Sequence, residues 1–338
     1  MDIINSLLAY GWWVAAICIV VGFVALVKGA DWLVDGASAV AKRFGISDLV
    51  IGLTVVAFGT SMPEFVVNMV SVAEGSTDLA ITNILGSNII NTLVILGLTA
   101  LVYPIVSQKR SRDFDIPMSI IAGVLVFAAV SVQSPWGETE RGVGRLAGIG
   151  LLAMFGYFLY NTFRHAKDHP DESGLVDDGV SGLVVSGMSV GKAVLLMVVG
   201  IAGLVIGGEL IVKSAVDIAT RMGVSEAVIG LTVVALGTSL PELATSVMAA
   251  FKKNCDIALG NVIGSNIFNV FFVLATSAVI HPLPAYEGIE LDAWVAAIGS
   301  IVVWLAVKTN KERKIKRWAG GLLLLIYASY LTYRLMNV

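Results

Sequence analysis

Two glutamates lie in the middle of long apolar stretches, where an acidic side chain is energetically unfavourable. Glu64 ends the segment VIGLTVVAFGTSMPE, and Glu242 ends the segment VIGLTVVALGTSLPE. An acidic residue at the centre of a membrane span costs at least ~2.5–3.5 kcal/mol, so it marks function by default. A purely structural pairing with a neighbouring helix would have to occur twice at equivalent positions. Because two carboxylates balance one divalent cation, we predict a cation site around them.

Each glutamate directly follows a proline, which predicts a break in the helix. Pro63 has no amide proton, so the carbonyl of Gly59 loses its helical partner, and Pro241 does the same to Gly237. The freed carbonyls join the Thr, Ser and Glu oxygens of each motif. Such an all-oxygen set suits hard cations such as Ca²⁺ and Na⁺, whereas Zn²⁺ or Cu⁺ favours Cys or His, and Mg²⁺ dehydrates reluctantly.

A second pair of motifs, GSNIIN (86–91) and GSNIFN (264–269), follows in the next apolar stretches. The Ser and the last Asn of each motif are four residues apart and share a helix face, so they can offer neutral oxygens to the cation. Small polar residues also hold membrane helices together, and this is the role that we predict for Asn88 and Asn266. The predicted site residues are Ser87, Asn91, Ser265 and Asn269.

The motifs recur because the chain repeats itself. Placing Gly29 over Gly207 aligns 29–104 with 207–282 without a gap, and the two glutamate segments are identical at 13 of 15 positions. Chance does not produce such a match. Each half holds five predicted spans, an odd number, so the second half enters the membrane from the opposite side. Many secondary transporters are built in this way, with the ion site at the midplane between the repeats.

The composition excludes a soluble protein. The 338 residues are 57% hydrophobic and 14% charged, whereas soluble domains carry about 25% charged residues. A net charge of −3 does not indicate nucleic-acid binding. We predict an all-α polytopic membrane protein with ten transmembrane helices, arranged as two inverted-topology repeats of five. The predicted spans are 12–40, 50–72, 79–102, 116–133, 145–163, 192–220, 228–250, 257–279, 291–308 and 318–335.

Charged residues near the ends of the first and sixth spans have a simpler explanation. They are spaced for pairing between residues three or four apart on one helix, and their long stems can reach the membrane surface. We therefore expect local ion pairs and stems that reach the membrane surface to account for most of this set, which is Lys28, Asp31 and Asp35 in the first span and Glu209, Lys213 and Asp217 in the sixth.

The basic residues predict the orientation. With the N-terminus outside, 16 of the 22 Lys and Arg residues fall in inner loops and four in outer loops. The positive-inside rule then places both termini outside the cytoplasm, in the cell (inner) membrane. We expect 1–163 to form the first repeat, 164–190 a cytoplasmic linker and 191–338 the second, inverted repeat. The linker is rich in Gly, Ser and acidic residues, which is typical of a solvated connection. The alternative is a regulatory cation site built from Asp171, Glu172, Asp177 and Asp178.

The paired motifs resemble the α-repeats of the cation/Ca²⁺ exchanger superfamily, specifically its prokaryotic Na⁺/Ca²⁺ exchanger branch. The resemblance rests on GTSMPE with GSNIIN and on GTSLPE with GSNIFN, and it covers nearly the whole chain. It implies an antiporter that exports Ca²⁺ while Na⁺ enters, with the first and sixth spans sliding across the other eight. The implied partners are the transported ions and membrane lipid. The sequence indicates neither a cofactor nor an obligate protein partner.

By motif position, the resemblance also implies a role for each site residue. The implied Ca²⁺ ligands, two of which are shared with Na⁺, are Glu64, Glu242, Thr60 and Thr238. The implied Na⁺ sites add Ser61, Ser239, Ser87, Ser265 and the main-chain carbonyls of Ala57 and Ala235. The implied centre of the cluster holds Asn91 and Asn269.

Asn269 departs from many relatives, including the K⁺-dependent exchangers, which carry Asp at this position. The departure argues against K⁺ co-transport. An H⁺/Ca²⁺ antiporter on the same fold is the alternative function, although proton exchangers usually carry an acidic residue where this chain has GSN. Two carboxylates can also share a proton and activate water in an enzyme. The surrounding hydroxyl and amide oxygens suit ion coordination better, so we predict no enzymatic activity.

Overall fold

The computed structural model describes residue 4 and residues 11–132, 141–168, 188–223, 235–286 and 288–336. The described residues are almost entirely helical. The first half contains α2 (Trp12–Phe44), α3 (Asp48–Ile51), α4 (Ala57–Thr60), α5 (Met62–Ala73), α6 (Thr77–Ile89), α7 (Leu96–Val102), α8 (Ile116–Ser131) and α9 (Arg145–Asp168). The second half contains α10 (Val190–Arg221), α12 (Ala235–Gly237), α13 (Leu240–Phe251), α14 (Cys255–Phe268), α15 (Ala275–Ile280), α16 (Ile289–Thr309) and α17 (Arg317–Met336).

Within the described residues, eight helical segments are long and apolar enough to cross a membrane. They correspond to eight of the predicted spans. The second predicted span is the bent pair Asp48–Thr60 and Met62–Ala73, whose two parts meet at 45°. The seventh predicted span, 228–250, begins outside the described residues, and its described part includes the apolar helix α13.

Among the described residues, three stretches of π-helix interrupt the α-helices, which the sequence did not predict. They are η1 (Gly52–Val56) between α3 and α4, η2 (Ile90–Ile95) between α6 and α7, and η6 (Asn269–Leu274) between α14 and α15. A fourth, η3 (Ser111–Asp115), precedes α8. Single π-turns inside helices are frequent at functional sites. Two of these contain or begin at the asparagines of the predicted site.

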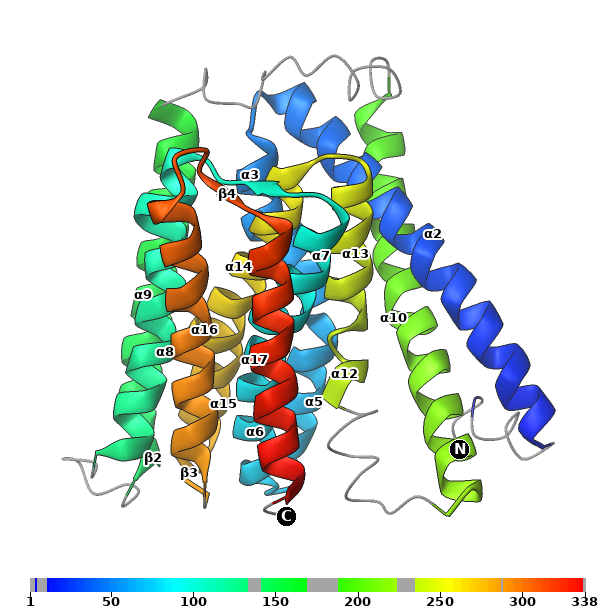
Figure 1. Ribbon diagram of the computed structural model, residues 1–338, viewed down its shortest axis with the longest axis vertical. Coiled ribbons are helices and arrows are strands. Elements are labelled where there is room, and N and C mark those ends of the chain that lie inside the picture. The colour runs from blue at the N-terminus through cyan, green and yellow to red at the C-terminus, as the bar shows by residue number, and fades with distance from the viewer. Residues whose placement is uncertain are drawn as a thin grey trace.

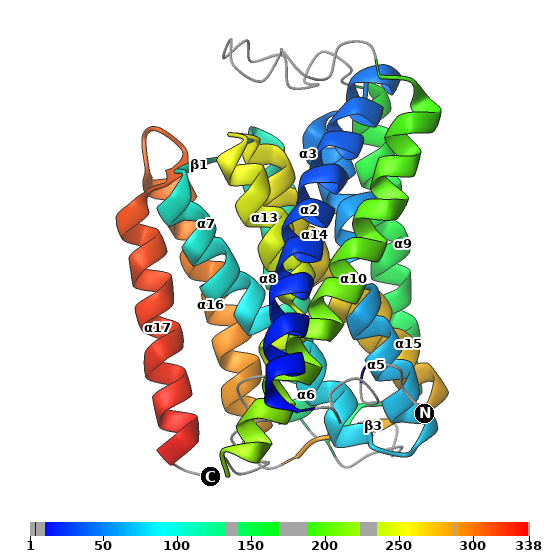
Figure 2. The same cartoon turned by 90° about the vertical axis from the view of Figure 1, so that its right-hand side faces the viewer.

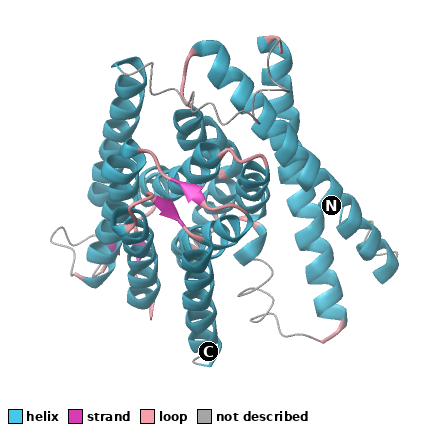
Figure 3. Cartoon of the chain, turned by 45° about the horizontal axis from the view of Figure 1, so that its top comes forward, coloured by secondary structure: helices cyan, strands magenta, loops and turns pink. Residues whose placement is uncertain are grey.

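In the part of the chain that the structure describes, four short strands lie at the two ends of the helix bundle, a small departure from the all-α prediction. β1 (Ile105–Val106) pairs antiparallel with β4 (Lys314–Ile315), and β2 (Gly142–Val143) pairs with β3 (Leu283–Pro284). Figure 3 shows the first pair crossing the face that comes forward. We call this the β1–β4 face and the opposite one the β2–β3 face. Ile105 and Ile315 are fully buried, so the ribbon ties the two halves together.

The helices α6–α7 and α14–α15 form the interior of the bundle. Each of these two spans is 78% buried, against 17–44% for the other candidate spans. The two GSN motifs therefore lie on the most enclosed helices. The two bent helices, one in each half of the chain, run in opposite directions. In Figure 1 the chain descends from α3 to α5, and it ascends from α12 to α13.

α2 and α10 form a tilted pair that lies along one side of the bundle (Figures 1 and 2). Their backbones touch at regularly spaced glycines. A Cβ added at Gly29 would lie 2.7 Å from the Gly200 carbonyl oxygen, and one at Gly22 would lie 2.8 Å from that of Gly207. Small residues of this kind let membrane helices approach closely. The two helices therefore pack as one unit.

Candidate functional site

The helix breaks place both glutamates at the start of a half-helix. Ser61 interrupts the first bent helix with φ −86° and ψ 9°, and Ser239 interrupts the second with φ −87° and ψ 4°. Glu64 and Glu242 then lie in the first turns of α5 and α13. The unpaired amides there carry partial positive charge, which favours a carboxylate. The predicted break is confirmed at both prolines.

Each carboxylate accepts hydrogen bonds from one serine of each half. Ser61 donates to Glu242 Oε1 at 2.7 Å, and Ser265 donates to the same oxygen at 3.4 Å. The other glutamate repeats this pattern through the equivalent residues of the repeat. Its Oε1 accepts from Ser87 at 3.3 Å and from Ser239 at 3.4 Å. The structure therefore brings four predicted serines and both glutamates into one cluster that joins the halves.

The second oxygen of each carboxylate has no partner among the described residues. Glu64 Oε2 and Glu242 Oε2 are both buried without a hydrogen bond, and both side chains are fully enclosed. No described Lys, Arg or His forms an ion pair with either. A buried carboxylate without a compensating charge is very costly. The pair therefore requires a cation or a proton.

Further unpartnered oxygens belong to the predicted set. Asn91 is fully buried, and neither polar atom of its amide has a partner among the described residues. The Asn269 amide donates to Asn88 Oδ1 at 3.1 Å and leaves its own Oδ1 free of hydrogen bonds. The hydroxyl of Thr238 is also buried without a hydrogen bond. Thr60 differs, because its hydroxyl lies 3.0 Å from Asn261 Oδ1.

Of the two predicted main-chain ligands, the carbonyl of Ala57 is less open than the side chains. The Ala57 carbonyl accepts the amide of Ser61 at 3.0 Å and the hydroxyl of Thr60 at 3.3 Å. An ion bound to this oxygen would compete with these hydrogen bonds. Ala235 is the first residue of α12 and directly follows residues outside the description.

Two asparagines that were not predicted from the sequence donate hydrogen bonds to the main chain of the glutamates. Asn83 Nδ2 donates to the main-chain oxygen of Glu64 at 3.4 Å, and Asn261 Nδ2 donates to that of Glu242 at 3.2 Å. These asparagines occupy equivalent positions of the two repeats and open the segments NILGSNIIN and NVIGSNIFN. Their repeated occurrence in apolar helices was the signal that could have identified them.

Asn88 and Asn266 join the two interior helices, as the sequence predicted. Asn88 Nδ2 donates to the main-chain oxygen of Asn266 at 3.2 Å, and Asn266 Nδ2 donates to Thr92 Oγ1 at 2.7 Å. These hydrogen bonds link α14 to α6 and η2, next to the glutamates. The two asparagines thereby fix the spacing of the helices that carry the site.

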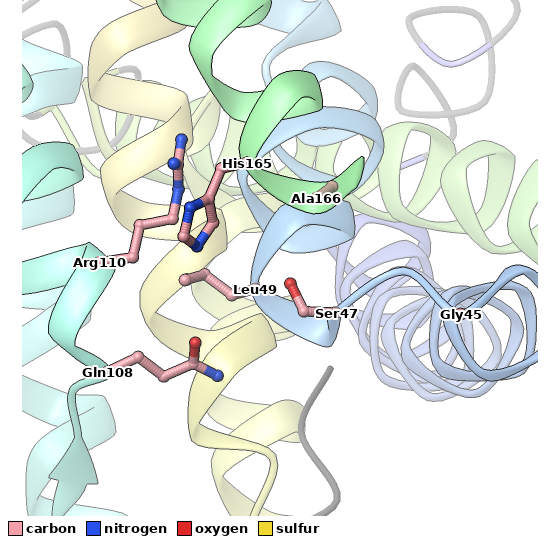
Figure 4. Close-up of a pocket in the computed structure, with 7 residues that line it drawn as sticks. All are labelled: Gly45, Ser47, Leu49, Gln108, Arg110, His165 and Ala166. Carbon is pink, nitrogen blue, oxygen red and sulfur yellow. The ribbon is translucent and has the colours of Figure 1, made fainter. Parts of the chain in front are cut away.

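Other groups in the described part of the chain offer no competing metal centre. No three His, Cys, Asp or Glu residues come together there in a way that would hold a metal ion. Figure 4 shows a small pocket near the start of α3 and the end of α9, where Arg110 lies beside His165. None of its lining residues belongs to the glutamate site. The pocket is lined by Gly45, Ser47, Leu49, Gln108, Arg110, His165 and Ala166.

Helices long enough to cross a membrane surround two unpaired carboxylates and several neutral oxygens. This arrangement defines a membrane protein with a binding site for a hard cation. Residues 14–164 and 192–336 match the sodium/calcium exchanger protein family, and the chain belongs to that family. The prediction from the repeated motifs is thus confirmed. It is a membrane transporter, a cation/Ca²⁺ antiporter.

Relatives match almost the entire length. The chain is 36% identical to the putative antiporter CaxA of Alkalimonas amylolytica, over 94% of this chain and 97% of the relative. It is 33% identical to the sodium/calcium exchanger MaX1 of Methanosarcina acetivorans, over 93% and 96%. A solved structure of the sodium-calcium exchanger NCX_Mj, soaked with 2.5 mM Na⁺ and 10 mM Sr²⁺, superposes with a TM-score of 0.80 at 32% identity, covering 95% and 99% of the two chains.

Proposed function

We propose that this protein exchanges Na⁺ for Ca²⁺ by alternating access at a site formed by Glu64 and Glu242. The observation that carries the proposal is the pair of buried, unpaired carboxylate oxygens, with each carboxylate bound by serines of both halves. Two negative charges are neutralised by one Ca²⁺. Several Na⁺ ions can use the same carboxylates with the flanking serine hydroxyls. Neither ion can then bind fully while the other is present, which is the basis of exchange.

The proposed architecture is ten spans in two inverted repeats, 1–163 and 191–338, joined by a linker at 164–190. The opposite directions of the two bent helices in Figure 1 support the inversion. The reciprocal serine–glutamate hydrogen bonds support the division into two equivalent repeats, because exchanging the halves reproduces the same pairs. Most of the linker lies outside the described residues. A site between inverted repeats can be opened to either side by moving one part against the other.

The experiment that tests this function is ⁴⁵Ca²⁺ uptake into proteoliposomes loaded with Na⁺. Uptake is expected to be fast when external Na⁺ is replaced by choline, and to collapse when Na⁺ is equal on both sides. Uptake driven by a proton gradient in Na⁺-free vesicles would instead favour the H⁺/Ca²⁺ antiporter. No gradient-dependent uptake at all would exclude both.

The proposed orientation places the β1–β4 face in the cytoplasm and both termini outside. The sixteen basic residues assigned to inner loops support this orientation. We expect that a cysteine introduced as Ser173→Cys, in a variant lacking Cys18 and Cys255, is not labelled by an impermeant thiol reagent in intact cells. The matched control Thr139→Cys, in a predicted outer loop, should be labelled. Labelling of Ser173→Cys from outside would reverse the assignment.

We expect exchange to be independent of K⁺. Asn269 offers a buried amide oxygen without a charge, so the site has only two negative charges and Ca²⁺ uses both. An added K⁺ would leave an uncompensated charge in a medium of low dielectric constant. Initial rates of Na⁺-driven Ca²⁺ uptake should be the same in choline and K⁺ buffers. Uptake that needs K⁺ would contradict the argument, and Asn269→Asp is the variant expected to introduce a new ion dependence.

A further inference from the structure

The turn between α13 and α14 holds α2 through polar side chains on the β1–β4 face. Lys252 Nζ lies 2.6 Å from Asp31 Oδ1 and 2.7 Å from Asp35 Oδ1, and it donates to the main-chain oxygen of Asp31 at 3.0 Å. Asn254 Nδ2 donates to Ser38 Oγ at 3.1 Å. The three α2 residues follow at intervals of four and three, so they share one face of the helix. The α13–α14 connection thus contacts α2 over about two turns of that helix.

This contact corrects the expectation of local ion pairs in the first span. Asp31 and Asp35 are paired with a lysine that belongs to the second repeat. The sixth span does behave as expected, because Lys213 Nζ lies 2.6 Å from Glu209 Oε1 on the same helix. The two repeats therefore differ in how they use equivalent charged positions.

The equivalent turn of the first repeat joins α5 and α6 on the opposite face. The alignment of the two repeats relates Lys252 to Glu74, and it relates Asp35 to Lys213. The two turns have the same backbone shape, since Lys253 and Gly75 both have positive φ, 57° and 76°. At this pair of positions the charges are exchanged, so Glu74 and Lys213 carry opposite signs, as Lys252 and Asp35 do. The other partner of Lys252, Asp31, is related to Glu209, which keeps the negative charge.

Only one of the two equivalent bridges is formed in this structure. Glu74 is exposed and makes no ion pair with any described residue. Lys213, the residue that would meet it, is paired within α10. Among the described residues, the Lys252 bridge thus joins the pair α2–α10 to the bundle at the β1–β4 face, whereas the equivalent ion pair between Glu74 and Lys213 is not formed.

We propose that Lys252 is a positioning residue that holds α2 and α10 in the state closed toward the β1–β4 face, and that Glu74 and Lys213 form the reciprocal bridge in the opposite state. Because α2 and α10 touch along their backbones, they move together, and fastening one end fixes both. The inference rests on the alternating access proposed above. It adds residues outside the ion site that set which side the site faces.

The test compares apparent Ca²⁺ affinities at the two faces of the full-length protein in oriented proteoliposomes. Lys252→Gln removes the bridge and raises the population open toward the β1–β4 face. The half-saturating Ca²⁺ concentration at that face should fall threefold to tenfold, while the value at the β2–β3 face rises. Lys252→Arg, which keeps the ion pairs, should restore the wild-type values.

Two further variants separate positioning from general damage. Lys253→Gln removes the neighbouring lysine, which makes no ion pair with a described residue, and should leave both affinities unchanged. Glu74→Gln removes the reciprocal bridge and should shift the affinities in the opposite direction to Lys252→Gln. A structural defect would not produce effects of opposite sign at the two faces.

The outcomes distinguish a failure of the positioning role of Lys252 from a failure of the proposed exchange function. If Lys252→Gln exchanges at wild-type rates with unchanged affinities at both faces, the positioning role is wrong while the exchange function stands. If the wild-type protein shows no Na⁺-dependent Ca²⁺ uptake, the proposed function fails first. If Lys252→Gln loses its thermal unfolding transition, the result from Glu74→Gln decides, and unchanged affinities in that variant would overturn the proposal.

Discussion

Replacing Glu64 or Glu242 by glutamine is expected to reduce Na⁺-dependent Ca²⁺ uptake at least 100-fold while the protein stays folded. Each substitution keeps the size of the side chain and removes half of the charge that balances Ca²⁺. Two unit charges 4 Å apart interact by about 4 kcal/mol at an effective dielectric constant of 20, which corresponds to about 10³-fold in binding. The measurements are initial uptake rates in proteoliposomes and Ca²⁺-dependent shifts of the unfolding temperature.

A matched control is available at the surface of the same protein. Glu290→Gln removes an exposed carboxylate that pairs with Arg141 at 2.7 Å on the β2–β3 side of the bundle. Exposed ion pairs contribute little, so this variant should exchange at nearly the wild-type rate. Full exchange by Glu64→Gln or by Glu242→Gln would remove these residues from the proposed site.

The sequence was sufficient to predict that the two glutamates and four of the serines gather in one buried cluster. The repeat marked each candidate twice, and a polar residue that recurs in apolar helices is too costly to be accidental. The prolines also predicted where the helices break, because Pro63 and Pro241 cannot donate to the preceding turn. These predictions depend on local chemistry and periodicity, which a single sequence carries.

The partners within that cluster depend on how the halves pack, and the sequence did not provide them. Ser61 precedes Glu64 by three positions, yet its hydroxyl donates to Glu242 at 2.7 Å. The π-helix η2 was also missed, because no propensity distinguishes one extra residue per turn in an apolar helix. The i, i+4 argument for Ser87 and Asn91 assumed regular α-geometry as far as Asn91, whereas η2 begins at Ile90.

The interaction of Lys252 with α2 was missed for a related reason. Lys28 and Asp31 are spaced for pairing within one helix, and only such local pairs are visible in a sequence. The tertiary contact with the turn after α13 replaced the local one because Lys252 reaches both carboxylates within 2.7 Å. A partner in the other half of the chain can be recognised only after the helices are placed.

The close contact between α2 and α10 leads to the second prediction with a large effect. Gly29 faces Gly200, and an added Cβ at either position would lie within 2.8 Å of a backbone oxygen of the other helix. A larger side chain must push the helices apart, and such overpacking costs typically about 1–3 kcal/mol. If α2 and α10 slide as one unit, separating them disrupts the movement that opens the ion site to one side of the membrane and then to the other.

We therefore expect Gly29→Leu to lower the rate of Na⁺-driven Ca²⁺ uptake at least tenfold, and Gly29→Ala to lower it by a smaller factor. Gly156→Leu is the matched control, because Gly156 lies within the membrane helix α9 and a Cβ there meets no atom within 4 Å. Uptake rates and equilibrium Ca²⁺ binding are measured on the same preparations. Because the glutamates lie on other helices, Ca²⁺ binding should survive in Gly29→Leu while turnover is lost. Wild-type turnover in that variant would show that α2 and α10 need not move as a unit.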